Sequence, residues 1–292
     1  MKTKQGVNCY DWSSMGTGDG WFGQSAIIYL GFVRECLIAN YDFIILECTS
    51  HFDTRGLSPF EHLYDILVFK FSPTLLGFAA SRVRKYMMLI HKQRFRFLQQ
   101  AADFGHFELF ESLFGRIVKL KGIDLCRAPA EDIDDYKKML ARRRGMPECR
   151  NSGRMWSSYQ VLSGSLRRMV YAHEAANSGR GNGVLCNARQ HATYMSGTVH
   201  VPALLRNSLL WNVKLRRILL PTEHMEIMGM QMYGTETENC AIAEHVRTLS
   251  CKDVRSLTGN GMHTAAIGTI FMYLLSVIEP LGFEAIEDGS EE

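Results

Sequence analysis

One cysteine near the start of the chain lies in surroundings that suit a nucleophile. Cys9 stands in the segment Gly6–Gly16 (GVNCYDWSSMG), whose small, polar and glycine residues favour a loop over a packed interior. A reactive thiolate needs access and electropositive or hydrogen-bonding surroundings that lower its pKa. Cys9 is therefore our candidate nucleophile, and an unreactive thiol in a loop is the alternative.

A carboxylate follows the first strand that the sequence predicts. Phe43–Leu46 is a short, wholly apolar run, which is typical of a strand covered on both faces of a parallel sheet. Glu47 comes directly after it, and ligands of open α/β sheets bind beyond the carboxyl ends of the strands. We therefore expect a functional carboxylate at Glu47.

Two arginines precede the second predicted strand, Tyr86–Ile90. Arg82 and Arg84 alternate, and alternate residues of an extended segment point to the same side, so both could face one pocket. In the alternative interpretation, Glu47 forms a purely structural ion pair with Arg82 or Arg84.

Helical patterns and turn residues around these strands predict an α/β sheet. The predicted helices are Ser25–Ala39, Pro59–Phe69, Glu131–Arg144, Pro221–Gly229 and Met262–Ile278. The last is long and apolar, but its length and polar residues favour a buried helix over a membrane span. Gly259-Asn260-Gly261 is expected to open this helix. The backbone N–H groups of this segment could approach a ligand closely; in the alternative, the segment forms only a tight turn.

Basic and aromatic residues are interspersed between residues 91 and 210. Arg142, Arg143 and Arg144 are the densest basic group, and Trp156, Tyr159, Tyr171 and Tyr194 lie in the same region. Such a mixture suits phosphate contact and base stacking, while solvated helix faces are the alternative.

The composition excludes few classes of protein. The chain has 292 residues, 46% hydrophobic and 22% charged, and a formal net charge of +3, which permits a polyanionic partner without demanding one. Its eight cysteines form no CxxC pair, so a zinc site is not supported. Residues 1–6 lack the apolar stretch of a secretory leader, and we expect an intracellular protein, nuclear if the source is eukaryotic.

Taken in order, five segments resemble motifs of the cytosine-5 DNA methyltransferase family. Gly6–Gly16 resembles motif IV, a loop with a Pro-Cys-Gln core. Phe43–Thr49 is similar to motif VI, an apolar strand that ends in Glu-Asn-Val. Gly77–Arg84 resembles motif VIII, with its Gln-x-Arg-x-Arg core, while Arg217–Gly229 and Leu257–Met262 look like motifs IX and X.

The resemblance implies methyl transfer from S-adenosylmethionine to cytosine C5 in DNA. Cys9 would add to C6, Glu47 would contact ring N3, and Arg82 and Arg84 would hold the base carbonyl and Glu47. Ser13 would support the loop or a phosphate.

Further residues would hold the cofactor and the DNA. Asn260 and Gly261 would lie against the cofactor, and Arg142–Arg144 would bind DNA that presents a flipped base.

The implied fold is α/β, an incomplete methyltransferase sheet of the Rossmann-like kind with an inserted target-recognition region. Residues 1–90 and 211–280 would form the catalytic part, 91–210 the recognition region and 281–292 an acidic tail. No segment resembles motif I, the family's glycine-containing cofactor loop. We therefore expect a cofactor-binding partner or a preceding segment.

Two other interpretations stay open. A catalytically inactive, methyltransferase-like module that binds nucleic acid or a partner would explain the missing motif I. A cysteine hydrolase that pairs Cys9 with His173 or His200 is the third possibility, although no oxyanion-type motif accompanies it.

Overall fold

The computed structural model describes residues 3–5, 10–13, 16–147, 156–178, 185–194, 200–237 and 241–282. The chain forms two compact units: unit 1 comprises 1–71, 83–115 and 268–292, and unit 2 comprises 72–82 and 116–267. Cys9 lies outside the described residues, as does the predicted acidic tail beyond residue 282.

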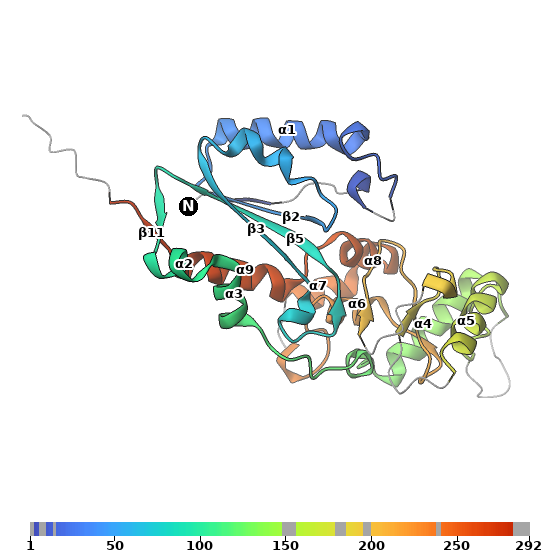
Figure 1. The fold of residues 1–292 in the computed structure, drawn as a ribbon. Coiled ribbons are helices and arrows are strands. Elements are labelled where there is room, and N and C mark those ends of the chain that lie inside the picture. The colour runs from blue at the N-terminus through green and yellow to red at the C-terminus, as the bar shows by residue number, and fades with distance from the viewer. Residues whose placement is uncertain are drawn as a thin grey trace, which may run out of the picture. The chain divides into compact units, whose positions relative to one another are not determined.

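A four-stranded mixed sheet forms the centre of unit 1 (Figure 1). Its strands, in spatial order, are β1 (Thr3–Gln5), β2 (Phe43–Thr49), β5 (Arg84–His91) and β3 (Tyr64–Phe71). The strands predicted at Phe43–Leu46 and Tyr86–Ile90 are confirmed. The parallel surroundings predicted for β2 are only half right, because β2 is parallel to β1 but antiparallel to β5.

The helix predicted over Pro59–Phe69 is wrong. Pro59 ends up in a 3-10 helix, Thr54–Phe60, and the apolar residues that follow form β3. Strand β3 pairs with β5 over its whole length, from Tyr64 opposite His91 to Phe71 opposite Arg84. The ladder with β5 is a long-range interaction, so it overrides a local pattern that fits either a helix or a strand.

Helix α1 (Gln24–Ala39) covers one face of this sheet (Figure 1). Its buried residues pack against β2 and β5; this core includes Tyr29, Phe32, Val33, Cys36, Ile44, Leu46, Cys48, Met87 and Leu89. The helix ends at Asn40, whose left-handed backbone (φ 47°) stops the helix as the turn residues predicted.

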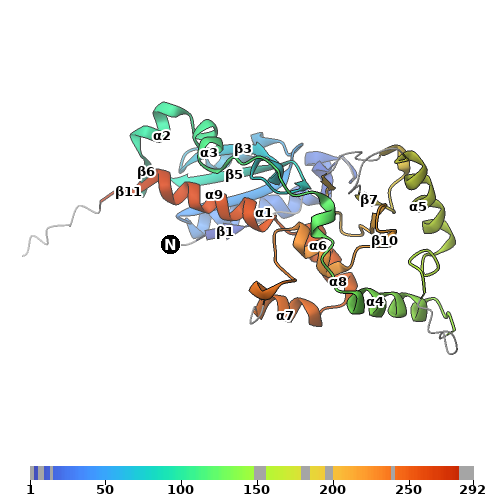
Figure 2. The ribbon, with the colours of Figure 1, turned by 90° about the horizontal axis from the view of Figure 1, so that it is seen from below.

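The other face of the sheet is covered by α2 (Gln99–Phe104), α3 (His106–Phe114) and α9 (Thr264–Val277) (Figure 2). Phe110 of α3 and Tyr273 of α9 both pack against Phe69 of β3, with ring centroids 5.2 and 5.4 Å away. A two-stranded ladder of β6 (Phe95–Phe97) and β11 (Ile278–Pro280) adds to unit 1. The boundary predicted at residue 90 therefore falls inside strand β5, and unit 1 continues to residue 115 because these elements pack on its sheet.

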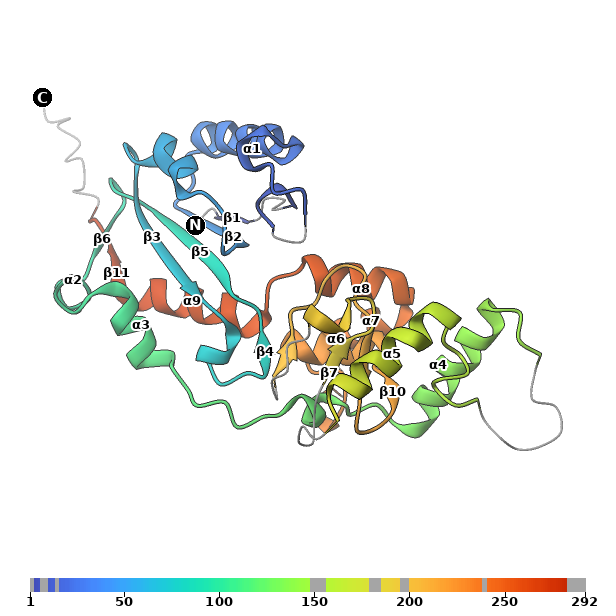
Figure 3. The same ribbon diagram turned by 45° about the vertical axis from the view of Figure 1, so that its right-hand side comes forward.

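Unit 2 combines helices with short strands (Figure 3). Its helices are α4 (Ala130–Arg143), α5 (Gly164–Ala176), α6 (Pro221–Ile227), α7 (Ala241–Thr248) and α8 (Cys251–Asn260). Strands β7 (Leu185–Asn187), β9 (Leu210–Asn212) and β10 (Arg217–Ile218) form an antiparallel sheet around the fully buried Trp211. Strand β4 (Ala80–Ser81) pairs in parallel with β8 (Val201–Pro202).

Short 3-10 helices occupy several connections. Besides Thr54–Phe60 they are Tyr10–Trp12, Gly20–Phe22, Pro73–Leu75, Gly122–Leu125, Ala192–Tyr194 and Thr235–Thr237. Within the described ranges, no helix is both long enough and apolar enough to cross a membrane. The predicted apolar helix Met262–Ile278 exists as α9, with buried residues such as Ala266 and Ile270.

Candidate active site

A buried ion pair marks the carboxyl end of β2. Arg84 Nε lies 2.9 Å from Glu47 Oε1, and the two side chains are 15% and 7% exposed. In the register of the sheet, Glu47 is opposite Tyr86 and Thr49 is opposite Arg84, so the paired residues are diagonal neighbours on one face. The strand that the sequence predicted thus places Glu47 beside one of its two predicted partners.

The segment that follows Cys9 is tied to the same strand end. Thr49 Oγ1 donates a hydrogen bond of 2.7 Å to the backbone oxygen of Trp12, and both groups are buried. Trp12 comes three residues after Cys9 in the sequence. This bond fixes the Tyr10–Trp12 turn against the end of β2, two residues beyond Glu47.

Asp11 anchors the same segment to the start of α1. Its carboxylate accepts hydrogen bonds from the backbone N–H of Ser25 at 2.6 Å and from Thr17 Oγ1 at 2.8 Å. The N–H of Ser25 is the main cause that lowers the pKa of Asp11, as expected for an acid at a helix N-terminus. A side chain at Gly23 would overlap the Asp11 carboxylate, since its Cβ would come within 2.2 Å.

Sequence reasoning gave no role to Asp11 or Thr49. Asp11 lies thirteen residues before the first residue of α1, too far for the local capping pattern to indicate its role. Ser13, predicted to support the loop, continues the same turn: its N–H donates to Tyr10 O at 3.2 Å and its carbonyl accepts from Gly16 at 2.9 Å.

An open pocket of about 390 Å³ lies beside this turn, on the side of the sheet covered by α1. Trp12, Trp21 and His51 supply aromatic rings, Asp53 lies among them, and Gly18 and Gly20 line another part. Ser13 and Asp11 also line the pocket. The Glu47 side chain points to the opposite face of β2, because its neighbours Leu46 and Cys48 belong to the core with Trp12.

The Arg82 guanidinium forms hydrogen bonds with backbone carbonyl groups. Its guanidinium donates to Leu204 O and Gly261 O, each at 3.0 Å, and to Gly259 O at 3.3 Å, and the residue is 5% exposed. Arg82 belongs to unit 2, whereas Arg84 belongs to unit 1 and pairs with Glu47. Arg82 and Arg84 were expected to face one pocket because they alternate in the sequence, but the contacts described above give them different partners.

Asn260 and Gly261 lie at the end of a helix, and the prediction that they open one is wrong. Asn260 is the last residue of α8 and Gly261 is its C-cap, while α9 begins at Thr264. The N–H of Gly261 donates to Leu257 O at 2.6 Å, and its carbonyl accepts from Arg82. Since helix C-termini carry partial negative charge and this N–H is already bonded, these residues do not fit as a cradle for S-adenosylmethionine.

The predicted DNA-binding arginines lie at the end of α4 and differ from one another. Arg144 donates to the carbonyls of Gln160 and Leu162, at 2.7 and 2.5 Å, and so ties α4 to the loop before α5. Arg142, Arg143 and Arg144 are all exposed. Of the three, Arg144 thus has a clear structural task.

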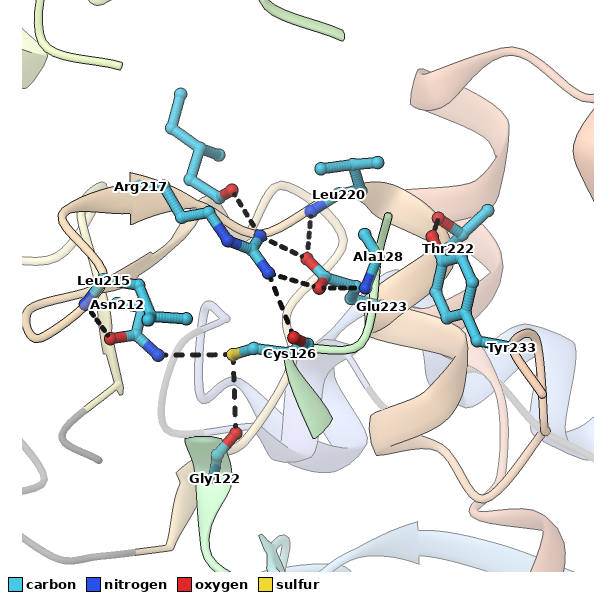
Figure 4. Close-up of polar contacts among 11 residues, drawn as sticks. Gly122, Cys126, Ala128, Asn212, Leu215, Arg217, Leu220, Thr222, Glu223 and Tyr233 are labelled. Carbon is cyan, nitrogen blue, oxygen red and sulfur yellow. Dashed lines mark hydrogen bonds and ion pairs between the residues drawn. The ribbon is translucent and has the colours of Figure 1, made fainter. Parts of the chain in front are cut away.

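A buried polar network in unit 2 also escaped sequence reasoning (Figure 4). The guanidinium of Arg217 forms two hydrogen bonds with the Glu223 carboxylate, at 2.7 and 2.6 Å, and the Glu223 side chain is fully buried. Glu223 also accepts from the N–H groups of Ala128 and Leu220, at 3.0 and 2.9 Å, and Arg217 donates to Cys126 O. Charged residues on either side of an apolar run, Ile218–Leu220, were the signal, because buried charges require partners.

Cys126 completes this network as a packing residue. Its Sγ accepts from Asn212 Nδ2 at 3.2 Å, and burial raises the pKa of the thiol to about 11. A thiol that stays protonated near neutral pH is a poor nucleophile.

The hydrolase alternative finds no support at His173. His173, offered as a hydrolase base, is 1% exposed, and its Nε2 lies 2.8 Å from Gln190 O. Across the described ranges, no three His, Cys, Asp or Glu side chains come together in a way that could hold a metal ion.

No protein-family model matches this chain, and no curated protein matches it. The chain is similar to solved structures of methyltransferases. Entamoeba histolytica methyltransferase EhMeth is 12% identical, with 94% of this chain and 76% of that chain covered and a TM-score of 0.47. S. pombe Dnmt2 is 14% identical, with 94% of this chain and 76% of that chain covered and a TM-score of 0.49. A mutant of Spodoptera frugiperda DNMT2 is 13% identical, with 94% of this chain and 78% of that chain covered and a TM-score of 0.41. At these identities and TM-scores, we infer function from the residues and their contacts alone.

Proposed function

We propose that this protein is a methyltransferase of the DNA (cytosine-5) kind, and that the described residues belong to the part that activates the base. The observation that carries the proposal is the junction at the end of β2. There the Glu47–Arg84 ion pair lies two residues from Thr49, which holds the segment that follows Cys9. The motif order in the sequence supports the same assignment.

In the proposed chemistry, the Cys9 thiolate forms a bond to C6 of a cytosine that has left the base stack. Glu47, acting as an acid, donates a hydrogen bond to ring N3, which draws electron density from C6 and favours the addition. The ring then carries an enamine whose C5 is a nucleophile and would form the bond to the methyl group. Loss of the C5 proton to a base, with expulsion of the thiolate from C6, then restores the aromatic ring. Arg84 is a positioning residue that fixes the Glu47 carboxyl.

S-adenosylmethionine would supply the methyl group, as the resemblance implies. Asn260 and Gly261 do not fit it, so we assign neither residue to the cofactor and propose that a partner or another segment holds it. Arg82 then anchors the end of α8 and has no direct contact with the base in this proposal.

The addition step can be tested without any methyl donor. Thiolate addition at C6 allows the hydrogen at C5 to exchange with solvent, because C5 takes a solvent proton before the original one is lost. We expect DNA labelled with tritium at cytosine C5 to release the label to water in the presence of the protein. Cys9→Ser should abolish release, and Glu47→Gln should slow it by about 10²–10⁴-fold, the usual contribution of one acid–base group. Label release at the same rate from Cys9→Ser would refute the proposal.

Exposed arginines at the end of α4 are the proposed DNA contacts. Arg142→Ala/Arg143→Ala should weaken DNA binding and lower the slope of log affinity against log salt by about 2, one for each lost phosphate contact. Lys138→Ala is a matched control on the same helix, since Lys138 pairs with Asp135 at 2.8 Å. An unchanged slope would remove these arginines from the interface.

A second candidate function is a module that binds nucleic acid or a catalytic partner without transferring methyl groups. The position of Asn260 and Gly261 at a helix C-terminus favours it, since the expected cofactor residues do not fit. Tritium release from cytosine C5 separates the two, because a module without the addition chemistry should release none. Heat of S-adenosylmethionine binding to this chain alone would also count against the module.

A further inference from the structure

The pocket beside Trp12 has the features of a preformed binding site. Its volume of about 390 Å³ lies within the range of small-molecule sites, ~300–1,000 Å³. Aromatic rings form part of its walls: Trp12 and Trp21 meet edge to face, with ring centroids 5.1 Å apart, and His51 lines the same space as Asp11 and Asp53. Walls of this kind suit a flat, uncharged ring.

Trp21 is held in place before any ligand arrives. Its Nε1 donates to Asp53 Oδ2 at 2.8 Å, and Arg55 binds the same carboxylate through its Nε at 2.9 Å. The indole also lies so close to Gly56 that a Cβ there would come within 2.3 Å of the ring. A wall whose rotamer is already fixed loses little entropy when a ligand binds.

Trp12 offers a hydrogen-bond donor that the described residues leave unused. The side chain is 5% exposed, and its Nε1 has no hydrogen-bond partner in the described part of the chain. A Cβ on Gly20, which lines the pocket, would stand 3.7 Å from this nitrogen. The donor therefore faces the glycine turn at the edge of the pocket, and an unsatisfied buried donor is costly unless something uses it.

Glycine keeps this edge of the pocket clear. Gly20 has a left-handed backbone (φ 55°), which few residues other than Gly and Asn adopt readily. Because Gly20 has no side chain, none fills the space beside the buried Trp12 N–H, where its Cβ would stand 3.7 Å from the nitrogen.

We propose that this pocket binds a nucleobase other than the one that reacts at Glu47. The ring would lie against Trp21, and a ring nitrogen or carbonyl on its edge would accept a hydrogen bond from Trp12 Nε1. The two sites are separate, since the pocket lies on the α1 side of the sheet and Glu47 points to the other face. The inference rests on the proposed function only in its choice of ligand: a base of the DNA substrate or the adenine of S-adenosylmethionine.

The four tryptophans allow a direct test by NMR. In protein labelled with ¹⁵N, the indole signal missing from Trp12→Phe identifies Trp12. Single-stranded oligodeoxynucleotide and S-adenosylmethionine are then titrated separately. We expect one of them to shift the Trp12 signal saturably, and the one that does so names the source of the base. If neither shifts it, the proposal fails.

Two glycines with a left-handed backbone provide a variant and its control. Gly20→Asn tolerates the left-handed backbone and puts an amide beside Trp12 Nε1, so it should weaken binding by about ten-fold or more. Gly145→Asn has a similar backbone (φ 63°) and open space around its Cβ, and Gly145 belongs to unit 2 and does not line the pocket, so this variant should bind like the wild type. Equal affinities of the two variants would overturn the proposal. If Gly20→Asn does not fold, Trp21→Leu serves instead, with the same expected loss and the same interpretation.

The outcome is independent of the proposed chemistry. A shift of the Trp12 signal without tritium release would support nucleobase binding in the pocket and refute the base-activating role of Cys9. Tritium release without a shift of the Trp12 signal would support the role of Cys9 and refute nucleobase binding in the pocket.

Discussion

At the scale of single residues, the Glu47–Arg84 pair is the feature on which the site depends. The side chains lie near the C-terminal end of β2 and at the start of β5, and both are largely removed from water. A buried ion pair adds little net stability when it is replaced as a whole, but removal of one partner leaves an uncompensated charge. The ion pair therefore fixes the position of the Glu47 carboxyl, and it makes stability sensitive to mutation of either residue alone.

This asymmetry gives a stability prediction. Arg84→Met should lower the free energy of unfolding by about 3 kcal/mol, because Glu47 loses its partner. The double variant Glu47→Gln/Arg84→Met should recover much of that loss. Urea unfolding of the single and double variants measures both effects, with Arg168→Met, an exposed position, as the control that changes stability by less than about 0.5 kcal/mol. A double variant as unstable as Arg84→Met would contradict this account.

At the scale of elements, the Arg217–Glu223 network joins strand β10, the start of α6 and the segment around Cys126. Glu223 accepts from the backbone N–H of Leu220, one of the groups that a helix start leaves unsatisfied. A single carboxylate therefore orders the helix start and a segment almost a hundred residues earlier in the chain.

Neighbouring arginines test this role. Arg217→Met should destabilise unit 2 by about 3–5 kcal/mol, since it strands a fully buried carboxylate. Arg216→Met, one residue earlier and exposed, should cost far less. Fluorescence of the buried Trp211 during urea unfolding reports on unit 2. Equal losses in the two variants would show that the network does not stabilise this unit.

Elements with a strong local pattern could be predicted from the sequence. The helices α1, α4, α6 and α9 and the strands β2 and β5 have apolar spacing, caps or turn residues that specify them locally. Strand β3 could not be predicted, because its apolar run fits a helix equally well and only the ladder with β5 decides.

The candidate site shows the same division. Glu47 and Arg84 could be named from a strand end and a spacing. The bond between Thr49 and Trp12, and the carbonyls bound by Arg82, join residues far apart in sequence, which a local pattern does not report. Asn260 was misplaced because a Gly-Asn-Gly turn between two helices can end one or begin the other.

At the scale of the whole molecule, unit 2 buries two histidines that affect its response to pH. Burial lowers the pKa of His224 to about 3, and burial together with the nearby Arg82 lowers the pKa of His263 to about 4. Histidine in the unfolded chain has an ordinary pKa near 6.5. Below that pH the unfolded chain therefore binds protons that the folded unit does not bind.

Folding of unit 2 should therefore weaken in mild acid. The contribution of each histidine is complete above about pH 6.5 and is lost as the pH falls toward its folded pKa, by roughly 3 kcal/mol at His263. His263→Gln should flatten the dependence of unfolding free energy on pH between 7 and 4. His245→Gln, at an exposed position of α7, should leave the dependence unchanged. An unaltered dependence in His263→Gln would exclude this histidine as a cause.

The most direct measurement of the central proposal is covalent capture of the base. DNA with 5-fluorocytosine at its target position cannot lose fluorine from C5, so methyl transfer onto a Cys9 adduct would leave the protein attached to the DNA. We expect intact mass spectrometry, with S-adenosylmethionine and any cofactor-binding partner present, to detect this conjugate and peptide mapping to place the bond at Cys9. Glu47→Gln should slow its formation. A conjugate that forms equally well in Cys9→Ser, or one attached at another residue, would contradict the account.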